Sequence, residues 1–263
     1  MSNIHLTAII EEGATIGNNT TIGPFVTIAS KVIIGSNNII EAHAVIDGRT
    51  TIGDGNHIFS HAVIGSIPQD LKYAGEDVEL IIGNHNKIRE FTLLNPGTKG
   101  GGSITKIGDN NLLMGYVHLG HDVILGNNCI LANGATLAGH VELGDNVVIG
   151  GFTPVHQFVH IGDFAMIAGA SALSQDVPPY CLAEGNRAVL RGLNLTGLRR
   201  HMNREEINAL KSIYKILFES GEALQEKAQS LLENENSESI KNLLEFITTS
   251  KRGIPFIRKN ING

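Results

Sequence analysis

The chain has 263 residues, including 31 glycines, nine phenylalanines and no tryptophan, and its formal net charge at pH 7 is −6. This composition argues against an aromatic-rich globular core, and basic residues without interleaved aromatic ones argue against a nucleic-acid surface. Two cysteines supply no disulfide framework, and no stretch approaches the roughly eighteen uninterrupted apolar residues of a membrane-spanning helix. We expect a cytoplasmic protein without stable membrane insertion, because the first residues also lack a basic segment followed by a long apolar one.

An aliphatic residue occupies every sixth position over residues 10–64, 82–94 and 107–173, with a shift of one residue before the last series. A six-residue unit, at about 3.3 Å per residue, makes one short strand and a corner, and three units close one triangular coil. The aliphatic side chains point inward and stack on those of neighbouring coils. The repeat predicts an all-β solenoid, a parallel β-helix, over residues 1–186, and it places Cys129 at a small packing position.

Two segments interrupt the repeat, at about residues 66–79 and 95–106. Extra residues in a solenoid usually leave the prism and line its binding face. The second segment contains three glycines at 100–102, but neither the Lys-Ser/Thr pattern nor the helix of a phosphate loop follows them. We predict that it forms a flexible flap over a site. The first segment presents three polar residues: Gln69, Asp70 and Lys72.

Histidines gather at one corner of the predicted prism. In the repeat, His121 and Asp122 fall on corner positions that elsewhere hold asparagine or serine, so we expect their side chains to point outward. Because one coil has about eighteen residues, Gly139 should lie beside His121, and His140 beside Asp122. Together with His118, these residues are predicted to form one outer patch.

Three roles for this patch remain open on the residues alone. The first is that they are exposed corner residues without a special function. The second is a zinc site built from His118, His121 and His140, whose nitrogens would have to converge at about 2 Å from the metal. The third is general-base catalysis, since a free imidazole with a pKa of about 6.5 is largely neutral at pH 7 and can accept a proton. Asp122 would then fix the tautomer of His121.

The hexads end near Leu173, and a connector with two adjacent prolines leads to a second domain, which we predict to be α-helical over residues 187–263. Asn203 followed by Glu206 resembles a helix N-cap with its capping-box partner. Apolar residues at helical spacing predict three helices, a first one that ends near Gly221 and two more at about 222–233 and 237–250.

Charge divides at the same boundary. Residues 187–263 hold 13 Lys and Arg against nine Asp and Glu, whereas residues 1–186 hold seven against 17. An acidic partner would therefore prefer the second domain. The alternative is that arginines such as Arg199 and Arg204 form only the solvated face of a helix.

Several segments together resemble the UDP-N-acetylglucosamine acyltransferases of lipid A synthesis, and the resemblance covers nearly the whole chain. They are QDLKYAGE at 69–76, GGGSITKIGDNNLLM at 100–114, HLGHD at 118–122, LANGATLAGHV at 131–141, VHQF at 155–158 and QDVPPY at 175–180. The resemblance implies a left-handed parallel β-helix with a C-terminal α-helical domain. It also implies a homotrimer with active sites between neighbouring prisms.

The implied reaction moves an (R)-3-hydroxyacyl group from acyl carrier protein to the 3-position of the sugar of UDP-N-acetylglucosamine, the first step of lipid A biosynthesis. No metal or separate cofactor is implied, because the donor carries its own 4'-phosphopantetheine on acyl carrier protein. His121 matches the general base of this family, Asp122 matches the carboxylate that orients it, and the backbone N–H of Gly139 matches the donor to the thioester oxyanion.

Other residues match the substrate-binding positions of the family. Gly169 matches the position that measures acyl-chain length, where glycine is similar to members taking long chains. Asn194 and Arg200 match nucleotide-binding positions. Positions that hold the nucleotide sugar or the acyl-pantetheine are matched by Gln69, Asp70, Lys72, His118, His140, His156 and Gln157.

The chain departs from the family pattern at Asn95 and Pro96, where relatives often have His-Arg, and at Thr196 and His201. These differences leave open whether the acceptor sugar carries a 3-hydroxyl or a 3-amino group. A second alternative is the later N-acyltransferase of the same pathway, although that enzyme carries an extra N-terminal domain, whereas the repeats here begin by Ile10. A zinc hydratase and a purely structural solenoid are the alternatives from other classes.

Overall fold

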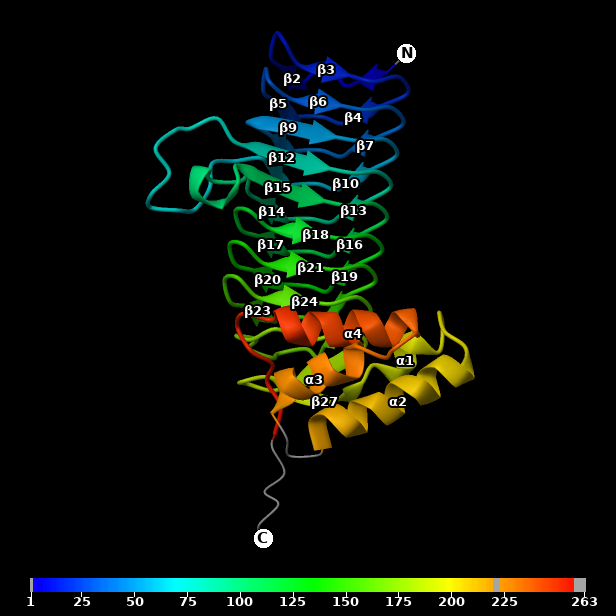
Figure 1. The fold of residues 1–263 in the computed structure, drawn as a ribbon. Helices are drawn as coiled ribbons and strands as arrows, with labels where there is room; N and C mark the ends of the chain where they lie inside the picture. Colours follow the sequence, from blue (N-terminus) through cyan, green and yellow to red (C-terminus); the bar gives the residue numbers. More distant parts are fainter. Residues whose placement is uncertain (1, 220–222, 258–263) are drawn as a thin grey trace.

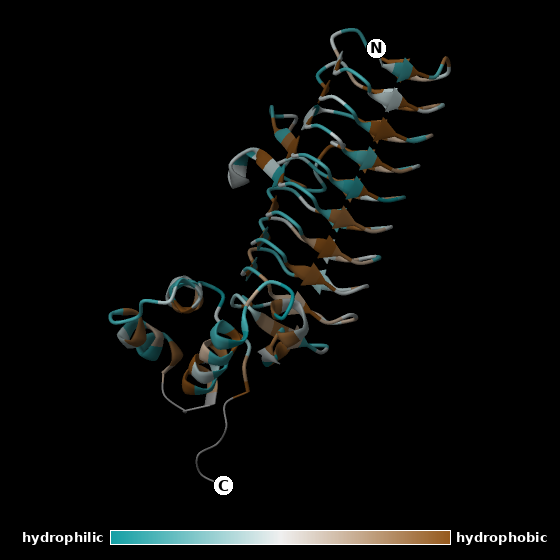
Figure 2. Cartoon of the chain, turned by 90° about the vertical axis from the view of Figure 1, so that its right-hand side faces the viewer, coloured by the Kyte–Doolittle hydropathy of each residue, from teal (hydrophilic) through white to brown (hydrophobic). Residues whose placement is uncertain are grey.

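A computed structural model describes residues 2–219 and 223–257, which form a long three-sided prism with four α-helices at one end (Figure 1). Along the hexad repeat, successive strands belong to three different sheets in turn, and strands one coil apart pair in parallel. This confirms the predicted β-helix of hexapeptide repeats. In Figure 2, apolar segments recur from coil to coil with hydrophilic segments between them.

The three faces are named sheets A, B and C. Sheet A contains β1 (Asn3–Ile4), β4 (Thr21–Ile22), β7 (Ile39–Ile40), β10 (His57–Ile58), β13 (Lys87–Ile88), β16 (Leu112–Leu113), β19 (Ile130–Leu131), β22 (Val148–Ile149), β25 (Met166–Ile167), β26 (Cys181–Glu184) and β27 (Val189–Leu193). Sheet B contains β2 (Ile9–Ile10), β5 (Thr27–Ile28), β8 (Val45–Ile46), β11 (Val63–Ile64), β14 (Leu93–Leu94), β17 (His118–Leu119), β20 (Thr136–Leu137) and β23 (Pro154–Val155). Sheet C contains β3 (Thr15–Ile16), β6 (Ile33–Ile34), β9 (Arg49–Ile52), β12 (Glu79–Ile82), β15 (Ile104–Ile107), β18 (Ile124–Leu125), β21 (Glu142–Leu143) and β24 (His160–Ile161).

The last residue of nearly every strand in the hexad repeat is an aliphatic one that points into the prism. Along the middle coils these side chains are almost completely buried, as for Ile58, Ile82 and Leu113. Ile82 pairs with Ile107, so the one-residue shift of the repeat leaves the inner stack unbroken. Burial of one such side chain contributes about 1.5–3 kcal/mol, and the stack is the main source of stability in the prism.

Polar side chains form a second stack, inside the corner between sheets C and A. At Asn56 the side-chain oxygen accepts the backbone N–H of Asn86 at 2.8 Å, and the side-chain amide donates to the carbonyl of Gly83 at 2.9 Å. The same pattern links the members of this asparagine ladder from coil to coil. Its members are Thr20, Asn38, Asn56, Asn86, Asn111 and Cys129.

Cys129 occupies the last position of the asparagine ladder. Its backbone N–H donates to the side-chain oxygen of Asn111 at 2.7 Å, and its thiol donates to the carbonyl of Gly144 at 3.2 Å. Burial raises the pKa of the Cys129 thiol to about 12, so the group stays protonated at neutral pH. The predicted packing role is confirmed.

Replacing Asn56 by alanine should lower the free energy of unfolding by about 2–4 kcal/mol, because it leaves a buried N–H and a buried carbonyl without partners. Lys87→Ala, at an exposed position on the neighbouring strand, is the control and should change it by less than about 0.5 kcal/mol. Urea unfolding followed by circular dichroism measures both. Equal stability of the two variants would contradict the role given to the ladder.

Both interruptions of the repeat leave the prism at the corner between sheets B and C. The first connects β11 to β12 and the second connects β14 to β15, and they lie on the same side of the prism (Figure 1). A 3-10 helix, η1 (Lys99–Gly101), lies in the second. Asn95 joins their bases, because its side-chain amide donates to the carbonyls of Ser66 and Ile67 at 3.0 and 3.1 Å.

The prism ends in a hairpin and not directly in helices. Strand β26 pairs in parallel with β25, and β27 returns antiparallel to β26, so the boundary predicted between residues 186 and 187 falls inside this hairpin. The helices are α1 (Leu195–Leu198), α2 (Arg204–Glu219), α3 (Leu224–Leu232) and α4 (Glu238–Thr249). None of the helices in the described part of the chain has the length and apolar character that a membrane crossing requires.

The predicted capping box is confirmed at the start of α2. The side chain of Asn203 accepts the backbone N–H of Glu206 at 2.9 Å, and the Glu206 carboxylate accepts the backbone N–H of Asn203 at 3.2 Å. Helices α3 and α4 fall within the two ranges predicted for them. The predicted end of the first helix, Gly221, lies outside the described residues.

A buried carboxylate fastens the segment after α4 to the end of the prism. Asp176 is 1% exposed and accepts the Ser250 hydroxyl at 2.7 Å and the backbone N–H groups of His160 and Arg252 at 2.9 and 3.3 Å. Its own N–H donates to the carbonyl of Gly253 at 2.9 Å. One side chain therefore joins the β-helix to the C-terminal segment.

Asp176→Ala should lower the free energy of unfolding by about 2–4 kcal/mol, because three donors lose a buried acceptor. Asp77→Ala removes an exposed carboxylate with ion pairs to Lys31 and Arg49 and should lower it by less than about 1 kcal/mol. Urea unfolding gives the two values, and hydrogen exchange should quicken at residues 250–253 in the Asp176 variant alone. Unchanged exchange there would contradict the fastening role.

Candidate active site

His121 and Asp122 form the corner that follows β17, between sheets B and C. Asp122 has a φ of 60°, a left-handed conformation that aspartate tolerates better than most residues. The repeat predicts that both side chains point outward at this corner. In the structure His121 is 7% exposed and Asp122 is 4% exposed, and the second interruption packs on Asp122.

A hydrogen bond orients the imidazole of His121. Its Nδ1 lies 2.8 Å from Oδ2 of Asp122, a contact that requires the proton on Nδ1 when the carboxylate is ionised. Nε2 then carries the free lone pair. Asp122 also accepts two bonds from Thr98, from the backbone N–H at 2.8 Å and from the hydroxyl at 2.6 Å. Thr98 lies outside the hexad repeat, so the spacing of the sequence does not predict its position.

Gly139 lies against the ring of His121, as the coil spacing predicts. A Cβ at Gly139 would come within 2.5–3.0 Å of three atoms of this ring, so any side chain would displace the imidazole. The backbone N–H of Gly139 forms no hydrogen bond within the described residues. The N–H remains able to donate to a group that enters beside His121.

His140 and His118 flank this pair. The ring of His140 meets that of His121 edge-on, with centroids 4.9 Å apart, and its Nδ1 lies 3.9 Å from Asp122. The Nδ1 of His118 lies 3.2 Å from the carbonyl of Leu93. Desolvation lowers the pKa of both histidines below the usual value, so burial disfavours a positive charge on either ring beside His121.

A cavity of about 540 Å³ opens beside this corner. His140 and Phe158 line one wall, and residues of the two interruptions line the rest. Of the residues predicted for substrate binding, the cavity gathers Asp70, Lys72 and His140. Gln69 is exposed next to Asp70, whose carboxylate accepts the backbone N–H of Lys72 at 3.0 Å.

The remaining predicted residues lie on several parts of the chain. His156 and Gln157 are exposed at the next corner along the same edge, one coil beyond Gly139. Gly169 is exposed at the corner between sheets A and B. Asn194 caps α1 and donates to the carbonyl of Phe164, at the corner between sheets C and A.

Arg200 is exposed just after α1. Within a single chain, neither Asn194 nor Gly169 lies at the edge that carries His121. Arg200 follows α1, the helix that Asn194 caps.

The zinc hypothesis requires that three imidazoles converge at this corner. Ligand atoms of His121, Asp122 and His140 lie within 4.8 Å of one another. His118, the third imidazole of the hypothesis, is not in this group. Asp122 already accepts hydrogen bonds at both oxygens, so a metal would have to displace at least one of them.

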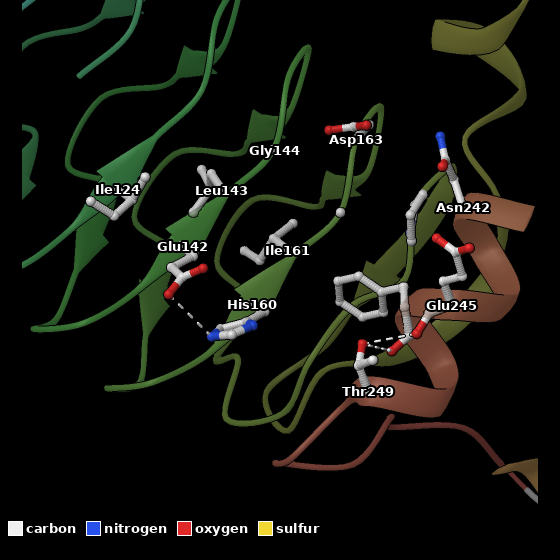
Figure 3. A pocket seen from close by; sticks show the side chains of 13 residues that line it. Ile124, Glu142, Leu143, Gly144, His160, Ile161, Asp163, Asn242, Glu245 and Thr249 are labelled. Carbon is white, nitrogen blue, oxygen red and sulfur yellow. Dashed lines mark hydrogen bonds and ion pairs between the residues drawn. The ribbon is translucent and has the colours of Figure 1, made fainter. Parts of the chain in front are cut away.

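A second cavity, of about 490 Å³, lies between sheet C and α4 (Figure 3). Its walls include Glu142, His160, Glu245 and Phe246, and the Glu142 carboxylate lies 3.6 Å from Nε2 of His160. None of the residues predicted for catalysis or substrate binding lines it.

Two family models match the chain. The one described as UDP N-acetylglucosamine O-acyltransferase, domain 2, matches residues 176–255, and the one described as bacterial transferase hexapeptide matches residues 13–48 and 104–139. An acyl-(acyl-carrier-protein)–UDP-N-acetylglucosamine O-acyltransferase of a Sulfurovum species is 75% identical over 99% of this chain and 100% of its own. The protein of the same name from Aliarcobacter butzleri is 65% identical over 98% and 100%.

Solved structures agree with these matches. UDP-N-acetylglucosamine acyltransferase from Campylobacter jejuni superposes with a TM-score of 0.94 at 50% identity, over 97% of this chain and 100% of its own. The enzyme from Francisella novicida gives a TM-score of 0.93 at 36% identity, over 98% and 95%. The prism is accordingly a left-handed parallel β-helix with a C-terminal helical domain. The chain belongs to the family of acyl-(acyl-carrier-protein)–UDP-N-acetylglucosamine O-acyltransferases.

Proposed function

We propose that the chain transfers an (R)-3-hydroxyacyl group from acyl carrier protein to the 3-hydroxyl of the sugar of UDP-N-acetylglucosamine, the first step of lipid A biosynthesis. Family membership supports the reaction, and the names of the relatives favour an oxygen acceptor over a 3-amino group or the later N-acylation. The observation that carries the mechanism is the 2.8 Å bond between Nδ1 of His121 and Asp122. It leaves Nε2 as the proton acceptor.

The donor thioester is already activated, so the enzyme needs no covalent intermediate. The sugar hydroxyl attacks the thioester carbonyl while Nε2 of His121 accepts its proton, and Asp122 stabilises the imidazolium that forms. The free N–H of Gly139 donates to the oxyanion of the tetrahedral intermediate. Cleavage of the carbon–sulfur bond then releases the phosphopantetheine thiolate, which takes the proton from His121. The carrier supplies the only prosthetic group, and no metal takes part.

Substrate binding follows from the cavity and from its charges. Asp70, Lys72 and His140 line the cavity, and Lys72 offers a cation to the nucleotide diphosphate. Gln69 precedes Asp70 in the chain. We assign Gln69, His118, His156 and Gln157 to the nucleotide sugar or the acyl-pantetheine, and Gly169 to the acyl chain. The second domain is the basic part of the chain, which supports docking of the acidic acyl carrier protein there.

A complete site requires more than one copy of the chain. His121 lies on the edge between sheets B and C, whereas Asn194 lies near the edge between sheets C and A, with Arg200 just beyond its helix. The proposed homotrimer places these nucleotide-binding residues of one subunit beside the His121 of its neighbour. Exposed aromatic rings at the third edge support a contact between copies, since Phe25, Phe91 and Tyr116 are 55%, 49% and 64% exposed. A cytoplasmic location fits a reaction between two cytoplasmic substrates.

His121→Ala should lower kcat by about 10²–10⁴, because the proton of the attacking hydroxyl loses its acceptor. Transfer of a radiolabelled hydroxyacyl group to UDP-N-acetylglucosamine measures it. His85→Asn, at an exposed left-handed corner position that holds asparagine in other coils, is the matched control and should keep full activity. Near-full turnover of His121→Ala would remove the general-base assignment.

Mixed subunits test whether the site is shared. His121→Ala and Arg200→Ala subunits should each be nearly inactive at low concentrations of the nucleotide sugar. Co-expressed in equal amounts, they should regain activity at about a quarter of the sites, because each site would take His121 from one subunit and Arg200 from the next. Activity that never exceeds the sum of the two separate variants would contradict a shared site, and analytical ultracentrifugation of the same samples reports the trimer.

A further inference from the structure

The second interruption of the repeat rests directly on the carboxylate that orients His121. Thr98 is 5% exposed and gives both of its donors to Asp122, the N–H to Oδ1 and the hydroxyl to Oδ2. Oδ2 is also the atom bonded to Nδ1 of His121. The hydroxyl of Thr98 and the imidazole therefore meet at one oxygen, and the position of that oxygen depends on both.

We propose that Thr98 is a positioning residue for the acyl transfer: it fixes the Asp122 carboxylate, and through it the ring of His121. The proposal rests on the proposed role of His121 as general base. A carboxylate on a single bond could turn about its terminal torsion, which has broad energy wells. Two charge-assisted bonds from one residue remove that freedom and keep water from the buried pair.

Close packing of the glycine run supports the same conclusion. A Cβ at Gly101 would lie 2.1–2.5 Å from the carboxylate carbon and oxygens of Asp122, so only glycine allows the segment to reach this depth. The neighbouring Gly100 would meet no atom within 4 Å. Gly100 and Gly101 both lie in η1, so they share the same local structure. They differ in that only Gly101 faces Asp122.

The segment that carries Thr98 is fastened at both sides. The carbonyl of Thr98 accepts the N–H groups of Gly101 and Ser103, both at 2.9 Å. The N–H of Gly97 donates to the carbonyl of Glu79 at 3.1 Å, which holds the segment to β12. Thr98 therefore reaches Asp122 from a preorganised turn, as a positioning group requires.

The hydroxyl of Thr98 is not itself a base or a nucleophile in this arrangement. Its proton is committed to Asp122, and the lone pair of Nε2 of His121 is the free acceptor. Thr98 lines the cavity, yet its effect is expected on turnover and not on binding of the nucleotide sugar. This separates a positioning role from a substrate contact.

The test compares kcat and KM for UDP-N-acetylglucosamine in the full-length enzyme. Thr98→Val keeps the shape but loses the hydroxyl, and kcat should fall about 10-fold or more with KM within about twofold. Thr98→Ser restores the hydroxyl and should return kcat to within about threefold of the starting enzyme. Thr92→Val, another buried threonine whose hydroxyl donates to a backbone carbonyl, should lose stability without loss of kcat.

The glycine pair provides an independent test that does not change Thr98. Gly101→Ala should lower kcat at least as much as Thr98→Val. Gly100→Ala places its Cβ in the cavity and away from Asp122, so kcat should stay within about twofold whatever the change in KM. Circular dichroism and thermal unfolding confirm that each variant is folded. If either Thr98 variant fails to fold, the comparison of the two glycine variants decides alone.

Unchanged kcat in Thr98→Val overturns the proposal, and so does a change confined to KM or equal losses in the Gly100 and Gly101 variants. Failure of the general-base assignment is seen separately, as activity retained by His121→Ala. If His121→Ala is inactive and Thr98→Val is fully active, the general base stands and the positioning role of Thr98 is wrong.

Discussion

Hydrogen bonds between successive coils, from backbone N–H groups to backbone carbonyls and to corner side chains, hold each residue beside the one eighteen positions later wherever no interruption intervenes. This registration converts spacing along the chain into distance in space. It brings Gly139 against the ring of His121, and it aligns the asparagine ladder inside another corner. Because each coil contacts only its neighbours, a fault at one level would separate the parts of the molecule above and below it.

The repeat made the prism and the centre of the site predictable from sequence. Ile82 and Ile107 pair although the twelve residues before Ile107 break the hexad repeat. The inward-pointing aliphatic side chain of Ile107 restores the register of the repeat. The same counting placed His140 beside Asp122. The capping box at Asn203 was predictable for another reason, since its hydrogen bonds are local in sequence.

The features that the sequence did not predict lie in segments that have no hexad repeat. The contacts of Thr98 and Gly101 with Asp122 come from a loop whose path is fixed by hydrogen bonds and by glycine packing, and neither of these has a spacing to count. The hairpin of β26 and β27 extends sheet A beyond the last hexad for the same reason. Family resemblance supplied Asn194 and Arg200, but only the fold shows that they lie away from His121 in one chain.

The asparagine ladder also limits how this architecture can change in size. The side chain of Asn56 accepts a backbone N–H from the next coil and donates to a carbonyl of that same coil, and Asn38 accepts from Asn56 in the same way. Members of the ladder can therefore be gained or lost only with a whole coil, or level. Gain or loss of part of a coil inside the prism would move every later side chain to the wrong face. A whole coil could be added or lost, because the coils on either side would still pair with each other. Extra residues can otherwise be accommodated only by leaving at an edge, which is where both interruptions lie and where this molecule has its candidate chemistry.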